Sequence, residues 1–187
     1  MASTARAVAS ATTDPWLAIH RRDVPLVVEA GMPPCGTWVA DLLARAPFCW
    51  RASGAPGEVA DLLEHAPSDL RALVAGLAQR FATLMDTDHV SVRVEGVTGN
   101  ACTRMHADYT DVRLILTLAG PGTEHLAGDN PAAPVRQLPP GHIGLFKGRS
   151  YPGAGHAPCL HRSPAIEGSG QCRLLLVIDT VREADCA

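Results

Sequence analysis

The sequence predicts an α+β fold in which a helical layer covers a β-sandwich or barrel. Apolar residues recur at helical spacing up to about residue 88, and short β-rich runs separated by Gly and Pro follow. The 187 residues are enough for one well-cored domain. We expect a tail and lead-in over 1–36 and a single domain over 37–187, with a helical layer over 37–88 and a β core over 89–182.

Three segments of the first half have helical periodicity, namely 37–46, 56–65 and 68–84. The third is the longest, with Ser68 as a good N-cap and an Asp-Thr-Asp sequence that ends it at residue 86. Its apolar positions are Leu70, Leu73, Val74, Leu77, Phe81 and Leu84. Prolines and a Gly-containing stretch over 52–56 separate the three segments, so we expect these intervals to be connectors.

The second half contains four β-rich segments, over 90–97, 112–118, 143–146 and 173–179. The first alternates strictly between valines and polar residues, which is typical of a strand with one buried face. Turn sequences at 120–122 and 139–141 separate the central segments. Short strands at this spacing indicate the sandwich or barrel that underlies the predicted fold class.

Composition excludes several classes of protein. A formal net charge of -3 provides no general surface for nucleic acid, and no apolar run approaches the ~20 residues of a membrane span. Six cysteines form neither a CxxC pair nor a dense disulfide framework, so we expect a reduced, cytoplasmic setting. The GxSxG, GxxxxGK and GxGxxG motifs of hydrolases and nucleotide-binding proteins are absent from the sequence.

One motif points to a metal. His106 and Asp108 are separated by one residue, so on a strand their side chains would project from the same face. His161 follows some fifty residues later, just before the last β-rich segment. Two imidazoles and one carboxylate can hold a divalent ion on one face and leave the other face open to oxygen and a substrate. The pattern predicts a mononuclear metal site.

Two arginines and a lysine are candidates for binding a negatively charged small molecule. Arg173 begins the last strand, where its planar fork would suit a carboxylate. On a regular strand, Arg113 shares a face with Ile115 and Thr117, so it is a candidate for binding substrate or cosubstrate, with a solvent-facing arginine on an outer strand as the alternative. Lys147, at a strand end, is a second candidate cation, with a surface lysine as the alternative. Glu124 and His125 are candidates for lining the same pocket, or for flanking an ordinary hairpin.

The cysteines provide a competing hypothesis. Cys102 precedes His106 by four residues and Cys159 precedes His161 by two, so both pairs could face one ion from extended segments. The four residues would then form a closed Cys2His2 zinc site, or Asp108 would replace one cysteine. Zinc would perform no oxygen chemistry. A third hypothesis is a metal-free, non-catalytic cupin-like binding domain in which the histidines are only core and loop residues.

The order of these residues resembles the Fe(II) and 2-oxoglutarate-dependent oxygenases of the double-stranded β-helix fold, particularly the phytanoyl-hydroxylase-like branch with its His-x-Ser…Arg ending. Over roughly residues 90–180 the sequence resembles, more closely, a bacterial family of unknown function, DUF1826. The matching pieces are Cys102 with His106-Ala-Asp108, Arg113, Gly120-Pro-Gly-Thr-Glu124, Leu145-Phe-Lys147-Gly148, His161-Arg-Ser-Pro164 and Arg173-Leu-Leu.

The resemblance implies a jelly-roll or cupin-like core that uses Fe(II), with 2-oxoglutarate as a small-molecule cosubstrate. His106, Asp108 and His161 would be the metal ligands, Arg173 would hold the far carboxylate of 2-oxoglutarate, and Ser163 would assist it. The reaction would be a hydroxylation or related oxidation coupled to decarboxylation of 2-oxoglutarate. The loop over 165–171 is slightly longer than in many relatives, and neither the motifs nor the resemblance names the substrate.

Overall fold

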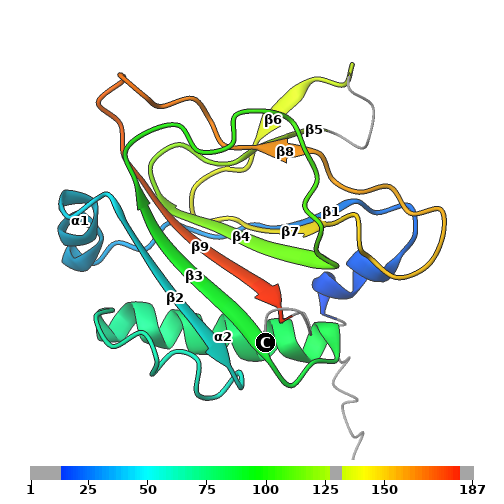
Figure 1. Ribbon diagram of the computed structural model, residues 1–187, viewed down its shortest axis with the longest axis horizontal. Helices are drawn as coiled ribbons and strands as arrows, with labels where there is room; N and C mark the ends of the chain where they lie inside the picture. Colours follow the sequence, from blue (N-terminus) through cyan, green and yellow to red (C-terminus); the bar gives the residue numbers. More distant parts are fainter. Residues whose placement is uncertain (1–13, 127–131, 182–187) are drawn as a thin grey trace, which may run out of the picture.

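Two antiparallel sheets form the centre of the protein (Figure 1). The computed structural model describes residues 14–126 and 132–181, so residues 1–13 of the expected tail and positions 127–131 and 182 of the expected β core lie outside the described residues. The major sheet has the order β1 (Leu26–Glu29), β7 (Ile143–Lys147), β4 (Val112–Ala119), β9 (Arg173–Thr180), β3 (Val90–Val97), β2 (Phe48–Gly54). The minor sheet has the order β6 (Val135–Gln137), β5 (Glu124–Leu126), β8 (His161–Arg162).

From β4 onward the chain winds between the two sheets. It leaves the major sheet for β5 and β6, returns in β7, crosses to β8 in the minor sheet and returns in β9. Gly120 turns the chain out of β4 with a φ of +81°, and a Cβ there would lie 2.1 Å from the carbonyl oxygen of Cys172, so glycine is required. This winding confirms the predicted α+β class with a double-stranded β-helix core.

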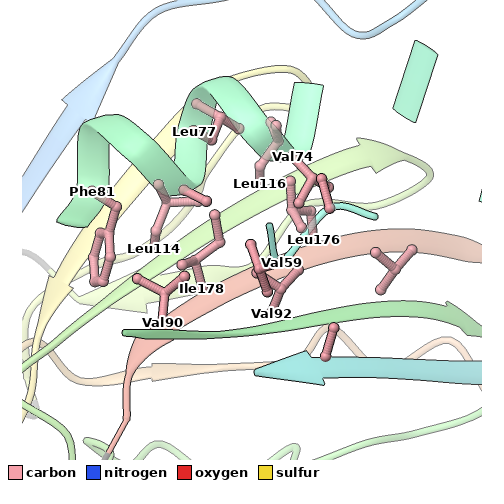
Figure 2. Packing of buried hydrophobic residues seen from close by; sticks show 14 of the residues in the cluster. Val59, Val74, Leu77, Phe81, Val90, Val92, Leu114, Leu116, Leu176 and Ile178 are labelled. Carbon is pink, nitrogen blue, oxygen red and sulfur yellow. The ribbon is translucent and has the colours of Figure 1, made fainter. Parts of the chain in front are cut away.

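The main hydrophobic core lies between the major sheet and helix α2 (Ser68–Met85). One stripe of α2, including Val74, Leu77 and Phe81, packs on strand residues that face it (Figure 2). Burying a side chain such as Phe81 contributes about 1.5–3 kcal/mol. The N-cap lies one residue earlier than expected: Pro67 occupies this position, and Ser68 is the first helical residue. The other helical elements of the described residues are a 3-10 helix η1 (Pro15–His20) and helix α1 (Thr37–Ala44).

The half of the chain in which we expect only helices and connectors also contributes strands. Both edge strands of the major sheet, β1 and β2, come from it. The helix expected over 56–65 is wrong, because this segment forms successive turns. Its apolar positions do not share one face: Val59 and Leu63 are buried, but Leu62 is 56% exposed. Among the described residues, no helix combines the length and apolar character that crossing a membrane requires.

Strand alternation decides which residues face the space between the sheets. In β4, Leu114 lies in the core beneath α2, whereas Ile115 belongs to a smaller apolar cluster between the sheets. Arg113 shares the face of Ile115, as the sequence predicts. Phe146 of β7 and Leu175 of β9 belong to the same small cluster. The inner face of the major sheet is therefore apolar in the middle and carries charged residues around it.

Candidate metal centre

His106, Asp108 and His161 lie together in the space between the sheets. One possible ligand atom from each lies within 4.8 Å of the other two, and no other group of three His, Cys, Asp or Glu in 14–126 and 132–181 meets this condition. The backbones of His106 and His161 pair directly: the N–H of His106 donates to the His161 carbonyl at 3.0 Å, and the N–H of His161 donates back at 2.8 Å. Directly paired residues project to the same side of a sheet.

The segment that carries His106 and Asp108 is not the strand expected from the sequence. His106 forms an isolated bridge to β8, and Asp108 lies in the loop that follows. The loop is held by Arg149, whose backbone N–H donates to the Asp108 carbonyl at 2.7 Å. The two side chains nevertheless reach the same place, with His106 Nε2 3.6 Å from an Asp108 carboxylate oxygen.

Both imidazoles have the orientation that a metal ligand needs. Nδ1 of His106 lies 2.8 Å from the Arg104 carbonyl oxygen, and Nδ1 of His161 lies 3.2 Å from that of Cys159. A carbonyl oxygen can only accept, so each Nδ1 carries a proton, and Nε2 is the nitrogen that would bind a metal once it has lost its own proton. These Nε2 atoms face Asp108. A backbone carbonyl on the distal nitrogen is the usual arrangement for a histidine that binds a metal.

Asp108 supplies the negative charge. Its side chain is 16% exposed, and its Oδ2 lies 2.8 Å from Arg113 Nη1 and 3.0 Å from His161 Nε2. Neither contact has hydrogen-bond geometry, so this buried oxygen has no hydrogen-bond partner among the described residues. Burial alone would raise the pKa of Asp108, but His161 and Arg113 outweigh it and lower that pKa to about 2. An ionised carboxylate with an unsatisfied oxygen beside two Nε2 atoms fits a divalent metal.

Arg113 holds this carboxylate in place. Its Nε and Nη2 donate to the two oxygens of Asp179 at 2.8 Å each, while Nη1 faces Asp108. Burial would lower the pKa of Arg113, but the two carboxylates raise it overall. The guanidinium is thus occupied on both sides, so the expected role in binding substrate or cosubstrate does not match its contacts. The sequence motifs do not include Asp179, which is the cross-strand neighbour of Arg113 on β9.

Beside the three clustered residues lies a cavity of about 170 Å³, whose walls include His106, His161 and Thr123. Thr123 Oγ1 accepts a hydrogen bond of 3.1 Å from Arg173 Nη2. Arg173 is 1% exposed, and burial lowers its pKa to about 10, with Glu95 and Glu124 acting in the opposite direction. Among the described residues, its Nε has no hydrogen-bond partner and no carboxylate lies within ion-pair distance. Arg173 is a buried cation that lacks an anion.

A family model described as a protein of unknown function, DUF1826, matches residues 44–179. The chain belongs to the DUF1826 family. No curated protein matches this DUF1826 chain.

Among solved structures, the DUF1826 chain is similar to the rice dioxygenase for auxin oxidation, with 13% identity and a TM-score of 0.53 over 88% of this chain and 76% of that one. This likeness supports the double-stranded β-helix fold. Two further matches have TM-scores of 0.48 and 15% identity. The Arabidopsis thaliana auxin dioxygenase in complex with 2-oxoglutarate matches over 73% of this chain and 66% of its own. A Pseudomonas putida prolyl-4-hydroxylase matches over 90% and 97%.

The remaining residues expected at the site of the DUF1826 protein divide into two groups. Ser163 lines the small cavity, and its backbone N–H donates to the Cys102 carbonyl at 2.8 Å. Lys147 lies on the other face of the sheet, because its neighbour Phe146 points between the sheets. Its Nζ donates to the Arg21 carbonyl at 2.7 Å. The expectation that Lys147 supplies a second cation to the pocket is therefore wrong.

Glu124 and His125 flank the site in β5. Glu124 accepts a hydrogen bond of 2.6 Å from Arg162 Nε, and both residues line a different cavity from the one beside the two histidines of the ligand group. His125 pairs with His161 in the register of β5 and β8, and its ring meets Phe146 edge-on with centroids 6.3 Å apart. Burial lowers the pKa of His125. Neither side chain belongs to the clustered ligand group.

The cysteines do not complete a Cys2His2 site. Cys102 Sγ lies 3.5 Å from Nδ1 of His106, which is the side of the ring turned away from Asp108. Cys159 is fully buried in the apolar cluster between the sheets, and burial raises the pKa of its thiol to about 12. Zinc is bound by the thiolate form, which such burial disfavours. Within the described residues, the ligand group contains Asp108 and neither cysteine.

Proposed function

We propose that this DUF1826 protein is a mononuclear Fe(II), 2-oxoglutarate-dependent oxygenase that hydroxylates or oxidises a small molecule or a protein. The observation that carries the proposal is the His106–Asp108–His161 group, whose possible ligand atoms lie within 4.8 Å of one another. Two imidazoles and one carboxylate are the ligands of non-haem Fe(II) oxygenases. Iron bound there with 2-oxoglutarate would supply oxygen activation coupled to decarboxylation of the keto acid.

Arg173 supports the choice of cosubstrate. Transfer of an arginine into a protein interior is costly unless an anion compensates it, and the described residues provide only the Thr123 hydroxyl. A carboxylate bound beside Thr123 would accept from the Arg173 Nε–H, which has no partner among the described residues. We assign the far carboxylate of 2-oxoglutarate to Arg173 and Thr123, with Ser163 at the same wall.

Other side chains prepare the site rather than react. Arg113 fixes the rotamer of Asp108 and keeps it ionised, so the carboxylate is ready to bind a cation at neutral pH. The carbonyls of Arg104 and Cys159 keep each imidazole in the tautomer with a free Nε2. Ile115, Phe146 and Leu175 form an apolar wall between the sheets, which limits the access of bulk water.

An anaerobic Fe(II) titration of metal-free protein, with and without 2-oxoglutarate, tests the proposal. We expect one Fe(II) per chain, a visible spectrum that changes when 2-oxoglutarate is added, and succinate once oxygen is admitted. Asp108→Ala should abolish iron binding, whereas Glu58→Ala, a carboxylate on an exposed turn, should not. Tightly bound zinc that survives His106→Ala but is lost in Cys102→Ser would overturn the proposal. So would iron binding without any response to 2-oxoglutarate, because the site would then use another ligand.

A further inference from the structure

A second and larger cavity, of about 530 Å³, is lined by Asp108. It extends along the inner face of the major sheet from β2 across β3 to the ends of β4 and β9. Arg93 and Arg113 border both this cavity and the small one beside His106 and His161. Asp108 lines the large cavity and the two histidines line the small one, so the ligand group borders both chambers. Thr123, which accepts a hydrogen bond from Arg173, lines the small chamber, so the large chamber is left for a different molecule.

The large chamber has an unusual pair of charges. Arg51 of β2 and Arg93 of β3 are directly opposite in the strand register, so both side chains project from the same face. Like charges at directly opposite positions destabilise a sheet. Arg51 is exposed and Arg93 is half-buried, so solvent screens part of this repulsion, and an anion bound between them would relieve the rest.

The described residues compensate this pair only in part. Arg93 Nε lies 3.3 Å from a Glu95 oxygen, but it is buried and has no hydrogen-bond partner there. No described carboxylate lies within ion-pair distance of Arg51. The two carboxylates that line the chamber, Asp108 and Asp179, are both engaged by Arg113. Arg51 and Arg93 therefore line the chamber, and no described acceptor forms a hydrogen bond with Arg93 Nε or an ion pair with Arg51.

We propose that the large chamber binds the substrate through an anionic group, a carboxylate or a phosphate, held between Arg51 and Arg93. A planar guanidinium fork matches both kinds of oxyanion, and two forks from adjacent strands would fix the orientation of the bound group. The rest of the molecule would then extend along the chamber toward Asp108, with Tyr109 at the wall. The reaction of that molecule rests on the proposed oxygenase function, whereas the anion site itself does not.

The test uses metal-free full-length protein, so that it is independent of iron and oxygen. Thermal unfolding is followed at constant ionic strength with inorganic phosphate, phenylacetate or the neutral phenylacetamide as the probe. We expect at least one anion to raise Tm in a saturable manner, by roughly 4 °C at ten times its Kd, and phenylacetamide to have no effect. Whichever anion acts identifies the substrate group as a phosphate or a carboxylate.

Variants locate the bound anion. Arg51→Gln and Arg93→Gln should each abolish the shift, while Arg22→Gln, which removes an exposed arginine outside the chamber, should retain it. Without anion, Arg51→Gln should unfold at the wild-type Tm or above it, because like-charge repulsion is relieved; this shows that the variant is folded. Arg173→Met should also retain the shift, because Arg173 serves the other chamber.

Three results would overturn the proposal: no anion raises Tm, the shift persists in both chamber variants, or it disappears only in Arg173→Met. The first two deny an anion site at Arg51 and Arg93, and the third places the anion at the cosubstrate site. Failure of the iron titration, by contrast, would reject the oxygenase while leaving the anion site supported by its own measurement.

Discussion

Replacing Arg113 with Met should destabilise the metal-free protein strongly, because it leaves two carboxylates without their cation. The side chain of Arg113 is 18% exposed, and those of Asp108 and Asp179 are 16% and 18% exposed, so solvent screens them little. Removing one partner from a buried ion pair costs about 3–5 kcal/mol. We therefore expect Arg113→Met to lower the free energy of unfolding by about 3–5 kcal/mol at pH 7.

The pH dependence provides the internal check. The pKa of Asp108 is lowered to about 2, from an unfolded value of about 3.9. A lowered carboxylate pKa stabilises the folded protein above the unfolded pKa, and this contribution of about 2–3 kcal/mol is lost as the pH falls from about 4 to 2. In Arg113→Met, the loss of this cation should raise the pKa of Asp108 above its wild-type value, although His161 still lowers it. The difference between wild type and variant should therefore shrink, by up to about 2 kcal/mol, from pH 7 to pH 2.5.

Urea unfolding followed by circular dichroism, with a chelator present, measures both effects. Arg162→Met is the matched control: its pair with Glu124 is 38% and 23% exposed, so we expect a loss of no more than about 1 kcal/mol. Arg113→Met combined with Asp179→Asn should recover part of the loss, because one unpaired charge is removed. A loss below about 1 kcal/mol in Arg113→Met, or the same loss at pH 7 and pH 2.5, would refute the role given to this arginine.

Three other substitutions test the cosubstrate site, the metal ligands and the hydrophobic core separately. Arg173→Met should weaken 2-oxoglutarate binding about 100-fold by calorimetry of the anaerobic iron form without changing the iron stoichiometry; unchanged affinity would remove Arg173 from the cosubstrate site. Cys102→Ser should leave the metal content unchanged by elemental analysis, and loss of the metal would favour the zinc hypothesis. Phe81→Ala, at a fully buried position beneath the major sheet, should cost about 3–5 kcal/mol in urea unfolding; a cost below about 1 kcal/mol would contradict the described packing.

The sequence predicts the elements whose pattern is local. β3 alternates buried and partly exposed residues over Val90–Val97, and α2 repeats its apolar residues over five turns, so each pattern identifies its element without tertiary information. The strand β2 is harder to find, because Pro47 precedes it and its last residues belong to a sequence typical of connectors. In 56–65, three apolar positions at helical spacing are too few to distinguish a helix from successive turns.

At the site, the order of the residues indicates the three clustered side chains, since His106, Asp108 and His161 are chemically distinctive. Their supporting residues depend on register. Asp179 reaches Arg113 only because β9 pairs with β4, and no local pattern contains that pairing. Lys147 shows a second limit of the sequence. It lies beside Phe146 in β7 as expected, but the packing of the two layers decides which face of β7 points toward the site, and the sequence does not contain this information.

The decisive experiment is a crystal structure of the protein prepared without oxygen, in the presence of 2-oxoglutarate and of Mn(II) as a substitute for Fe(II). The account predicts one metal ion bound by Nε2 of His106, a carboxylate oxygen of Asp108 and Nε2 of His161, with the keto acid on the metal and its far carboxylate on Arg173. A metal bound to Cys102 and Nδ1 of His106, or 2-oxoglutarate bound away from Arg173, would contradict it.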